Sequence, residues 1–296
     1  MMPNSLAALL ELLDLEPLEV NHFRGLSPTT PHQRVFGGQV AAQALVAAGR
    51  TVDEPDRRVH SLHSYFLRPG DPTIPILFEV DRIRDGRSFT TRRVVAIQHG
   101  RAIFNLSASF QVDEPGPDHA MAMPDVPSAE SLPTVRERVA EHADRFSDEA
   151  MEWLERTTPL ETRPVHEPHW LSPGKREPVQ DIWFRATDRM PDDPLLHACV
   201  VAYASDMSLL DTTVLPHEMA GTPFMMASLD HAMWFHRPFR ADDWLLYHQV
   251  SPSASGARGL AEGYVFRSDG ALVVTVIQEG LIRPLADDAA SAGGSA

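Results

Sequence analysis

The 296-residue sequence predicts an α+β protein made of two tandem units, each with an antiparallel sheet wrapped around a buried central helix. Three observations lead to this prediction. Two helical stretches lack charged residues almost entirely, each is followed by four strand-like runs, and the same order occurs in both halves of the chain. A helix that is apolar nearly all round must be buried on nearly every side. An antiparallel sheet that curls around the helix provides this burial.

The N-terminal unit is assigned to residues 1–112. It opens with a leucine-rich segment from Leu6 to Leu13, interrupted by Glu11, which predicts a short amphipathic helix lying on the protein. An extended segment at Leu18–Arg24 precedes the alanine-rich central helix, predicted from Gly38 to Gly49. Turn-forming residues then separate the four expected strands, Val59–Arg68, Ile74–Arg84, Ser88–Gln98 and Ala102–Val112.

The C-terminal unit, residues 179–284, repeats this order. A strand at Val179–Thr187 precedes a central helix at Leu195–Leu210. Local echoes support a duplication, since the run from Tyr65 to Pro69 parallels that from Trp234 to Pro238. We expect the two units to pair edge strands into one long sheet, because this removes two exposed edges. The four strands that follow the second helix are Met226–His236, Asp243–Ser251, Arg258–Arg267 and Ala271–Arg283.

Two further segments complete the predicted organisation. Residues 113–178 are rich in proline and charge and form a connector, with a helical patch at about Pro133–Leu154. Residues 285–296, composed mainly of Ala, Asp, Ser and Gly, are expected to form a flexible tail.

The composition narrows the possible partners and location. With 26 basic and 41 acidic side chains, the formal net charge is −15, which disfavours a primary role on nucleic acid. A single cysteine, Cys199, excludes an intrachain disulfide and indicates a reducing, cytoplasmic setting. No run approaches the ~20 apolar residues of a membrane span, and the N-terminus lacks the features of a signal peptide.

Several common catalytic and cofactor-binding patterns are absent from the sequence. It contains no G-x-S-x-G nucleophile motif, no phosphate-binding G-x-x-x-x-G-K loop and no G-x-G-x-x-G fingerprint. The pair His166 and His169 flanks a proline and is better interpreted as part of a surface loop than as a metal site. We therefore expect neither a metal nor an organic cofactor.

Three residues of the second half are candidates for catalysis. Asp206 is the only acidic residue between Leu195 and Leu210, Ser228 begins a strand, and Gln278 shares a strand face with apolar residues. Each also has an ordinary structural interpretation: a helix-ending aspartate in solvent, a strand-end hydroxyl and an edge-strand amide bonded to the backbone. Taken together, they suit the holding of one water molecule, because only Asp206 could assist removal of a proton.

Several segments resemble the acyl-CoA thioesterase II family, the double-hotdog thioesterases. The resemblance covers about residues 5–284, and its most distinctive segment is the run from Ser228 to Pro238, SLDHAMWFHRP. The other matching segments are Gly37-Gly38-Gln39 with Gln43-Ala44, His60–Phe66, Arg68-Pro69-Gly70-Asp71, Ala204-Ser205-Asp206, Ala257-Arg258-Gly259 and Gln278-Glu279-Gly280.

This resemblance implies a double hotdog that hydrolyses acyl-CoA to a free acid and CoA. It implies a water-activating triad of Asp206, Ser228 and Gln278, with serine where many relatives have threonine, and a homo-oligomeric assembly. The N-terminus of the first central helix, near Gly38, is the candidate for stabilising an oxyanion. Six arginines are available for the CoA phosphates, and the alternative is that most of them are ordinary exposed arginines on strand faces: Arg82, Arg84, Arg87, Arg92, Arg93 and Arg258.

Two alternatives remain open at this point. One is a hotdog hydratase or dehydratase acting on enoyl thioesters, for which His231 beside Asp230 could supply the catalytic pair, although neighbours in a strand point to opposite faces. The other is a non-catalytic acyl-CoA binding protein. The complete triad argues against the second alternative.

Overall fold

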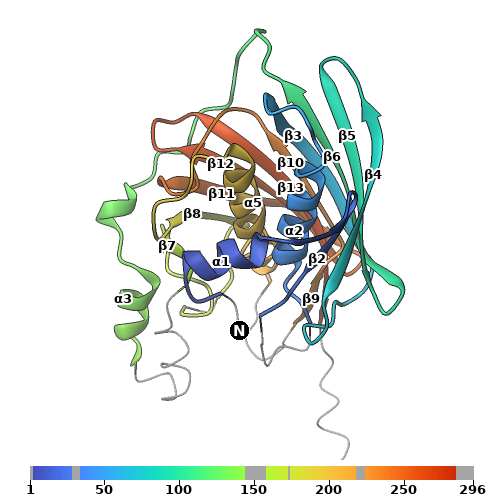
Figure 1. Cartoon of the computed structure of the whole chain (residues 1–296). Coiled ribbons are helices and arrows are strands. Elements are labelled where there is room, and N and C mark those ends of the chain that lie inside the picture. Colours follow the sequence, from blue (N-terminus) through green and yellow to red (C-terminus); the bar gives the residue numbers. More distant parts are fainter. Residues whose placement is uncertain (1–2, 29–33, 144–157, 173, 218–223, 285–296) are drawn as a thin grey trace, which may run out of the picture.

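A long, strongly curved antiparallel sheet surrounds two central helices (Figure 1). The structure is a computed structural model that describes residues 3–28, 34–143, 158–172, 174–217 and 224–284. Its strands follow the order β1-β2-β4-β5-β6-β3-β10-β13-β12-β11-β8-β7, and β9 pairs with β13 beside this path. The predicted α+β class and the wrapping of a sheet around buried helices are confirmed.

The first half begins with a helix on the outside of the central pair. Helix α1 (Leu6–Leu13) buries Leu6, Leu9 and Leu13, and Ser5 caps its N-terminus. The predicted segment at residues 18–24 is instead a hairpin of two short strands, β1 (Glu16–Glu19) and β2 (His22–Gly25). The central helix α2 (Gly37–Gly49) is followed by β3 (Arg57–Phe66), β4 (Ile76–Asp85), β5 (Phe89–Gln98) and β6 (Arg101–Val112), each close to its predicted range.

The second half repeats the pattern with two departures. Strand β8 (Val179–Ala186) precedes helix α5 (Pro194–Ser205), which ends earlier than predicted and is followed by a short 3-10 helix, η3 (Leu210–Val214). The strand predicted at 226–236 is divided at Leu229 into β9 (Phe224–Ser228) and β10 (Asp230–Phe235). The remaining strands are β11 (Leu245–Ser255), β12 (Arg258–Arg267) and β13 (Leu272–Pro284).

A change of pairing partners accounts for the break at Leu229. Strand β10 is hydrogen-bonded to both β13 and β3, whereas β9 pairs with β13 alone. Between them, the N–H of Leu229 donates to the carbonyl of Glu279, and its carbonyl accepts from the N–H of Phe66 in the first half. The β3–β10 pairing joins the two halves into one sheet, as expected from the need to remove exposed edges.

The connector is only partly described. It contains a 3-10 turn, η1 (Ala129–Ser131), helix α3 (Val135–Ala140) and strand β7 (Leu160–Pro164), which pairs with β8. The helical patch predicted from residue 133 is represented by α3, and its later part lies outside the described residues. The same holds for the predicted tail at residues 285–296. The division into units at residues 112, 178 and 284 remains a prediction.

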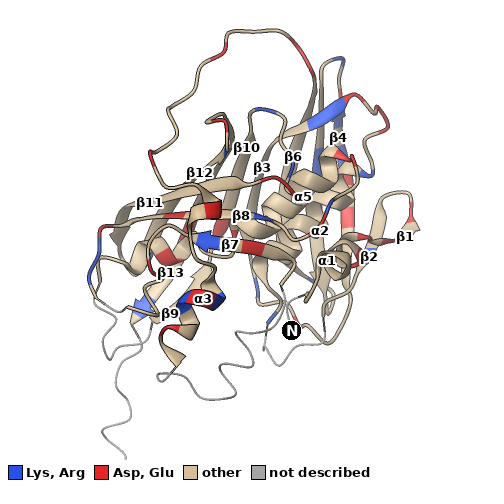
Figure 2. Cartoon of the chain, turned by 90° about the vertical axis from the view of Figure 1, so that its left-hand side faces the viewer, with Lys and Arg blue, Asp and Glu red and all other residues tan. Residues whose placement is uncertain are grey.

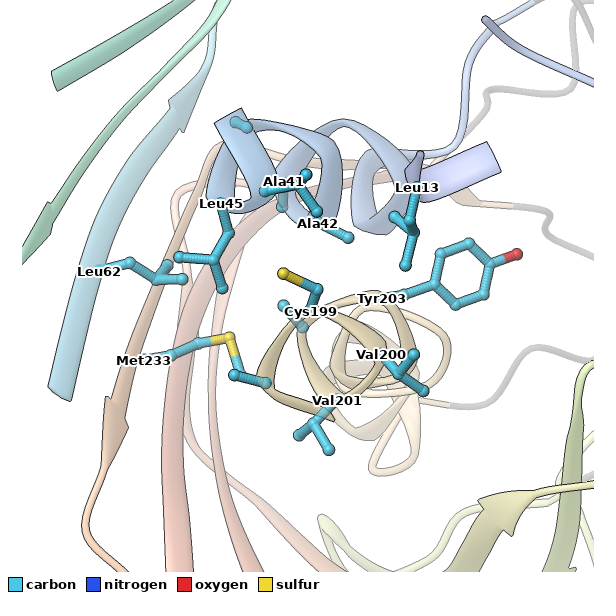
Figure 3. Packing of buried hydrophobic residues seen from close by; sticks show 14 of the residues in the cluster. Leu13, Ala41, Ala42, Leu45, Leu62, Cys199, Val200, Val201, Tyr203 and Met233 are labelled. Atoms are coloured by element: carbon cyan, nitrogen blue, oxygen red, sulfur yellow. The ribbon is translucent and has the colours of Figure 1, made fainter. Parts of the chain in front are cut away.

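The two central helices pack against each other inside the sheet, and neither contains a charged residue, so their ribbons are tan in Figure 2. Figure 3 shows this core: Leu62 of β3 and Met233 of β10 point from the sheet toward Leu45 of α2 and Cys199 of α5, and these four side chains are buried. The close contact of α2 and α5 brings the N-terminus of one helix to the C-terminus of the other, and this juxtaposition positions the candidate site.

Candidate active site

The structure brings the three predicted residues together. Asp206 is the C-cap of α5, Ser228 is the last residue of β9, and Gln278 lies in β13. The Gln278 Nε2 group donates to Asp206 Oδ1 at 2.7 Å, and the Ser228 hydroxyl donates to the same oxygen at 3.3 Å. Gln278 is thus bonded to a side chain and not to the backbone, and Asp206 is bonded within the protein. Ser228 is a strand-end hydroxyl, but it ends β9 instead of beginning the predicted strand.

Asp206 faces the N-terminus of α2 as well as ending its own helix. The backbone N–H of Gly38 donates to its carboxylate. Phe36, the N-cap of α2, makes no side-chain capping bond, so the first-turn N–H groups are open to the aspartate. The positive end of the α2 dipole thus compensates for the unfavourable dipole of α5.

Two glycines allow this close approach. A Cβ atom on Gly37 would lie 2.7 Å from Asp206 Oδ2, and one on Gly38 would lie 2.6 Å from the carbonyl oxygen of Tyr203 in α5. Both distances are shorter than any real Cβ contact. The Gly37-Gly38 pair is therefore required for the crossing of the two helices and for the position of the carboxylate.

The neighbouring glutamines of α2 have a structural role. The amide of Gln43 donates to the carbonyls of Leu12 and Leu26, and the amide of Gln39 donates to Leu26 and to the hydroxyl of Ser27. These bonds attach the N-terminal segment to the central helix. They account for two conspicuous polar residues on a helix that is otherwise apolar.

Burial controls the ionisation of Asp206. It raises the pKa of this carboxyl group to about 6, although the hydrogen bonds from Gln278, Gly38 and Ser228 favour the charged form. At neutral pH the group is ionised with a pKa close to that of a useful general base. Asp211, in η3, has a pKa raised to about 6 by burial and by the charge of Asp206.

Asp206 and Ser228 line a cavity of about 780 Å³ between the halves of the molecule. Gly37 and Phe66 contribute to its wall from the first half, and Asp211 from the second. Gln278 lies behind this wall, fully buried, and its Oε1 atom has no hydrogen-bond partner among the described residues. The cavity therefore exposes one carboxylate and one hydroxyl to a ligand, held from behind by an amide.

A second cavity of about 410 Å³ lies on the opposite side of the segment that follows α5. Ala204, Met207, Ser208 and Asp211 line it together with residues of the connector, including His166 and His169. Asp211 is shared by both cavities. Neither Ser228 nor Gln278 reaches this second space.

The arginines suggested for phosphate binding are not at the first cavity. Arg82, Arg93 and Arg258 form ion pairs with Asp53, Asp81 and Glu279. Arg92 is fully buried and bonded to Asp85 and Thr51. Arg84 and Arg87 lie at the turn between β4 and β5 and do not line the cavity either. The sequence alone could not show that these arginines are distant from the cavity. Arg92, Arg93 and Arg258 pair with acidic residues of neighbouring strands, and such pairs depend on the register of the sheet.

Other reactive residues are placed in structural roles. His231 is fully buried, its Nε2 is 2.9 Å from the Ser205 hydroxyl, and burial lowers its pKa to about 4. Asp230 instead accepts the N–H of Glu279 at 2.6 Å, so the pair suggested for a hydratase is not assembled at the cavity. Burial raises the pKa of the Cys199 thiol far above its usual range. The described residues contain no group of three potential metal ligands.

Comparison with known proteins agrees with this geometry. Residues 26–111 match the model of the acyl-CoA thioesterase N-terminal domain, and residues 152–281 match that of the acyl-CoA thioesterase family. Human acyl-coenzyme A thioesterase 8 is 45% identical over 288 residues, covering 92% of this chain and 88% of its own. The chain belongs to the acyl-CoA thioesterase family. Acyl-CoA thioesterase 2 of Haemophilus influenzae is 39% identical to this family member, over 95% of this chain and 99% of its own.

Solved structures support the same assignment. The acyl-CoA thioesterase II TesB2 of Mycobacterium marinum superimposes with a TM-score of 0.77 at 48% identity, covering 94% of this chain and 99% of that one. A hot dog fold protein of Alicyclobacillus acidocaldarius, only 18% identical, has a TM-score of 0.76 over 94% and 99% of the two chains. The predicted double hotdog is confirmed for this family member.

Two polar groups of the cavity escaped the sequence analysis. Asp211 was not singled out because it follows the predicted helix and has no distinguishing motif. Arg34 precedes α2 in a segment without periodicity, so nothing in its surroundings indicates that it lines the same cavity as Asp206. Arg68, also at the cavity, was recognised only as part of a family motif.

Proposed function

We propose that this protein hydrolyses acyl-CoA thioesters to carboxylic acids and CoA, with Asp206, Ser228 and Gln278 holding and activating the attacking water. The observation that carries the proposal is the clustering of these three side chains around one carboxylate at a cavity wall. Family membership supplies the substrate class.

The arrangement supports general-base catalysis by water and not an acyl-enzyme. Asp206 is the one base that Ser228 contacts among the described residues, over a long 3.3 Å bond, and we assign this carboxylate to the attacking water. Oδ2, on the side of Gly37, accepts one hydrogen of the water. The second hydrogen faces the Ser228 oxygen at the cavity wall, while Gln278 holds the carboxylate from behind.

The reaction then proceeds in two steps. The water oxygen attacks the thioester carbonyl while one of its protons moves to Asp206, giving a tetrahedral oxyanion. The oxyanion collapses, the carbon–sulfur bond breaks, and the departing thiolate receives the proton from Asp206. The carboxyl group is regenerated in its ionised form, so no group of the protein is consumed.

The first turn of α2 is our candidate for stabilising the oxyanion. The N–H of Gly38, which the sequence suggested as an oxyanion donor, donates to Asp206 and is not available to the oxyanion. Gly37 and Gln39 both line the cavity, and as first-turn residues their N–H groups have no intrahelical acceptor. Donors of this kind, fixed before the reaction, are the usual means of stabilising an acyl-transfer intermediate.

The test is a thiol-release assay with purified protein and acyl-CoAs of short, medium and long chain length. The proposal expects turnover with at least one of these substrates. Crotonyl-CoA hydration, measured in parallel, tests the hydratase alternative. Binding of acyl-CoA without release of thiol from any substrate would favour a non-catalytic binding protein and would contradict the proposal.

The setting of the protein is also proposed. We infer a cytoplasmic homo-oligomer from the single cysteine and from the family resemblance. No helix among the described residues is long and apolar enough to cross a membrane. Light scattering of the purified chain measures the assembly state, and a mass equal to that of one chain would contradict this part of the proposal.

A further inference from the structure

We propose that Arg34 and Arg68 form the phosphate-binding site for the nucleotide end of CoA at the mouth of the catalytic cavity. The inference rests on the proposed hydrolysis of acyl-CoA and adds the residues that recognise its anionic part. Both arginines line the cavity that contains Asp206 and Ser228, and they are the only basic residues among its described lining. Both are exposed, which places them at the opening.

The two arginines come from segments that are held side by side. The N–H of Val35 donates to the carbonyl of Gly70 at 2.8 Å, so the chain entering α2 runs along the chain leaving β3. A Cβ on Gly70 would lie 3.0 Å from a methyl group of Val35, which shows how tightly these segments pack. The two segments that carry Arg34 and Arg68 therefore lie side by side at the cavity.

The same segments are attached to the catalytic cluster. The N–H of Phe66 donates to the carbonyl of Leu229 at 2.9 Å, directly after Ser228. Arg68 follows two residues later, at most about 7 Å further along the backbone. The edge that carries Arg68 is thus close to the catalytic cluster along the same cavity, and we assign the CoA arm to this edge.

Arg68 is oriented in advance, whereas its charge remains uncompensated. One of its terminal nitrogens donates to the carbonyl of Ala102 at 2.6 Å, and its backbone N–H donates to Ile103 at 3.1 Å. Within the described part of the chain, no carboxylate lies within 4 Å of Arg34 or Arg68. Among the described residues, neither charge is therefore neutralised by an ion pair, although the chain as a whole has a net charge of −15.

The chemistry of the guanidinium group fits this role. It offers several N–H donors in a planar arrangement that matches phosphate oxygens, and its charge persists at any physiological pH. The 3′-phosphate and the diphosphate of CoA present such oxygens. The carbonyl of Ala102 occupies only part of the donor set of Arg68, so the remaining N–H groups are available to a phosphate.

The experiment compares two thioesters of the same acyl group: the acyl-CoA, and the acyl-N-acetylcysteamine thioester, which lacks all phosphates. Arg68→Gln and Arg34→Gln should each raise KM for the acyl-CoA about tenfold, the loss typical of one hydrogen bond to a charged group, with little change in kcat. Hydrolysis of the phosphate-free thioester should stay within about twofold of wild type. Glutamine removes the charge and is too short to keep the bond to Ala102, so the rate with the phosphate-free thioester measures any structural effect of Arg68→Gln.

Arg87→Gln is the matched control, because Arg87 is distant from the proposed site. Arg87 lies just before the first residue of β5, whereas Ala102, which Arg68 contacts, lies just beyond the other end of that strand. It should leave both substrates unaffected. Equal losses on both thioesters, or an unchanged KM for acyl-CoA, would overturn the assignment of these arginines while leaving the proposed function intact. Failure of the wild-type protein to cleave either thioester would instead contradict the proposed function, and this inference with it.

A binding measurement gives a readout that does not depend on turnover. Titration calorimetry with adenosine 3′,5′-bisphosphate should detect binding to the wild-type chain and to Arg87→Gln, and weaker binding to the Arg34 and Arg68 variants. Added salt should reduce the difference, because exposed charges are screened. Equal binding by all four proteins would contradict the proposal.

Discussion

At the scale of single residues, the properties of Asp206 follow from where its carboxylate lies. The group is partly buried at a cavity wall, and three donors converge on it, from Gln278, Gly38 and Ser228. Burial favours the neutral acid and the donors favour the anion, and the balance leaves a pKa of about 6. A carboxylate with this pKa is ionised at neutral pH and is a stronger base than an exposed aspartate.

This value predicts the pH dependence of the reaction. Because the ionised form is the base, kcat should rise as the pH increases through about 6 and level off above it. Asp206→Asn should lower kcat by about 100-fold or more, as usual for loss of a general base, and should remove this pH dependence. Rates measured from pH 5 to 8 test both expectations. A wild-type rate that is constant over this range would exclude Asp206 as the titrating base.

The same ionisation affects stability. The folded-state pKa of Asp206 is raised above its ordinary value of 3.8, so its contribution to stability is fully present below about pH 3.8 and is lost as the pH rises through about 6. Asp206→Asn should therefore gain stability over wild type between pH 4 and pH 7, by no more than about 3 kcal/mol. Denaturant unfolding of both proteins at several pH values measures this difference. A difference that stays constant or shrinks with rising pH would contradict the burial argument.

Ser228 provides a second test at this scale. Its hydroxyl donates to Asp206 and faces the cavity, so Ser228→Ala should lose about 2–4 kcal/mol of transition-state stabilisation, as for one fixed catalytic donor. Ser228→Thr retains the hydroxyl and should keep substantial activity. Comparison of kcat/KM for the two variants separates the hydroxyl from the size of the side chain. An alanine variant with wild-type turnover would show that Ser228 has no catalytic role.

At the scale of elements, the contact between α2 and α5 creates the environment of the site. Helix α2 lacks a capping side chain, and two glycines at its start let α5 approach closely enough for Asp206 to reach its first-turn N–H groups. The glycines are therefore required for different reasons. Gly37 gives space to the carboxylate, and Gly38 gives space to the backbone of α5.

These two roles predict different defects. In Gly37→Ala the new methyl group would meet both Asp206 Oδ2 and the ring of Phe66, so kcat should fall at least tenfold, and the Phe66 ring must shift to limit the loss of stability. In Gly38→Ala it would meet the carbonyl of Tyr203, so the helices must separate at a cost of about 1–3 kcal/mol. Activity and urea unfolding of both variants measure these effects. Gly116→Ala is the control, since a Cβ there meets nothing within 4 Å, and identical behaviour of all three variants would refute this account.

At the scale of the whole molecule, the site requires both halves. Asp206, Ser228 and Gln278 come from the second half, whereas Gly37, Gly38 and Phe66 come from the first. The β3–β10 pairing and the α2–α5 contact hold these parts together. We propose that residues 1–112 and 179–284 are two duplicated units, of which only the second carries the triad.

The register of the sheet supports a single site in each chain. The parallel runs that begin at Tyr65 and Trp234 make Ser64 the counterpart of Met233. Ser64 pairs with Leu106 in the first half and Met233 pairs with Val276 in the second, so Leu106 is the counterpart of Val276. Two residues further along, Gln278 therefore corresponds to Ala108, a buried residue without an amide. Helix α2 also has no acidic residue that could replace Asp206.

A single site predicts that Asp206→Asn removes nearly all turnover instead of half of it. Folding and acyl-CoA binding should persist, because the substitution keeps the shape of the side chain. The residual kcat and the number of acyl-CoA molecules bound by each chain are the quantities to measure. Retention of nearly half of the wild-type kcat would show that the first half has a working site of its own.

The sequence by itself determined the order of the elements, the two central helices and the three residues of the candidate triad. Hydrophobic periodicity and turn residues are local, so they placed α2 and most strands within a few residues. The triad followed from family resemblance and from the rarity of acids on an apolar helix. The structure then showed that these side chains are in contact.

Only the tertiary structure decided how Asp206 is stabilised and which arginines face the cavity. The break at Leu229 depends on a partner strand from the other half, and the donation from Gly38 depends on the crossing of two helices far apart in the chain. Arg92 and Arg258 found acidic partners across the sheet, whereas Arg34 and Arg68 did not. Such contacts join residues distant in sequence, so their geometry is set by packing and is absent from any local pattern.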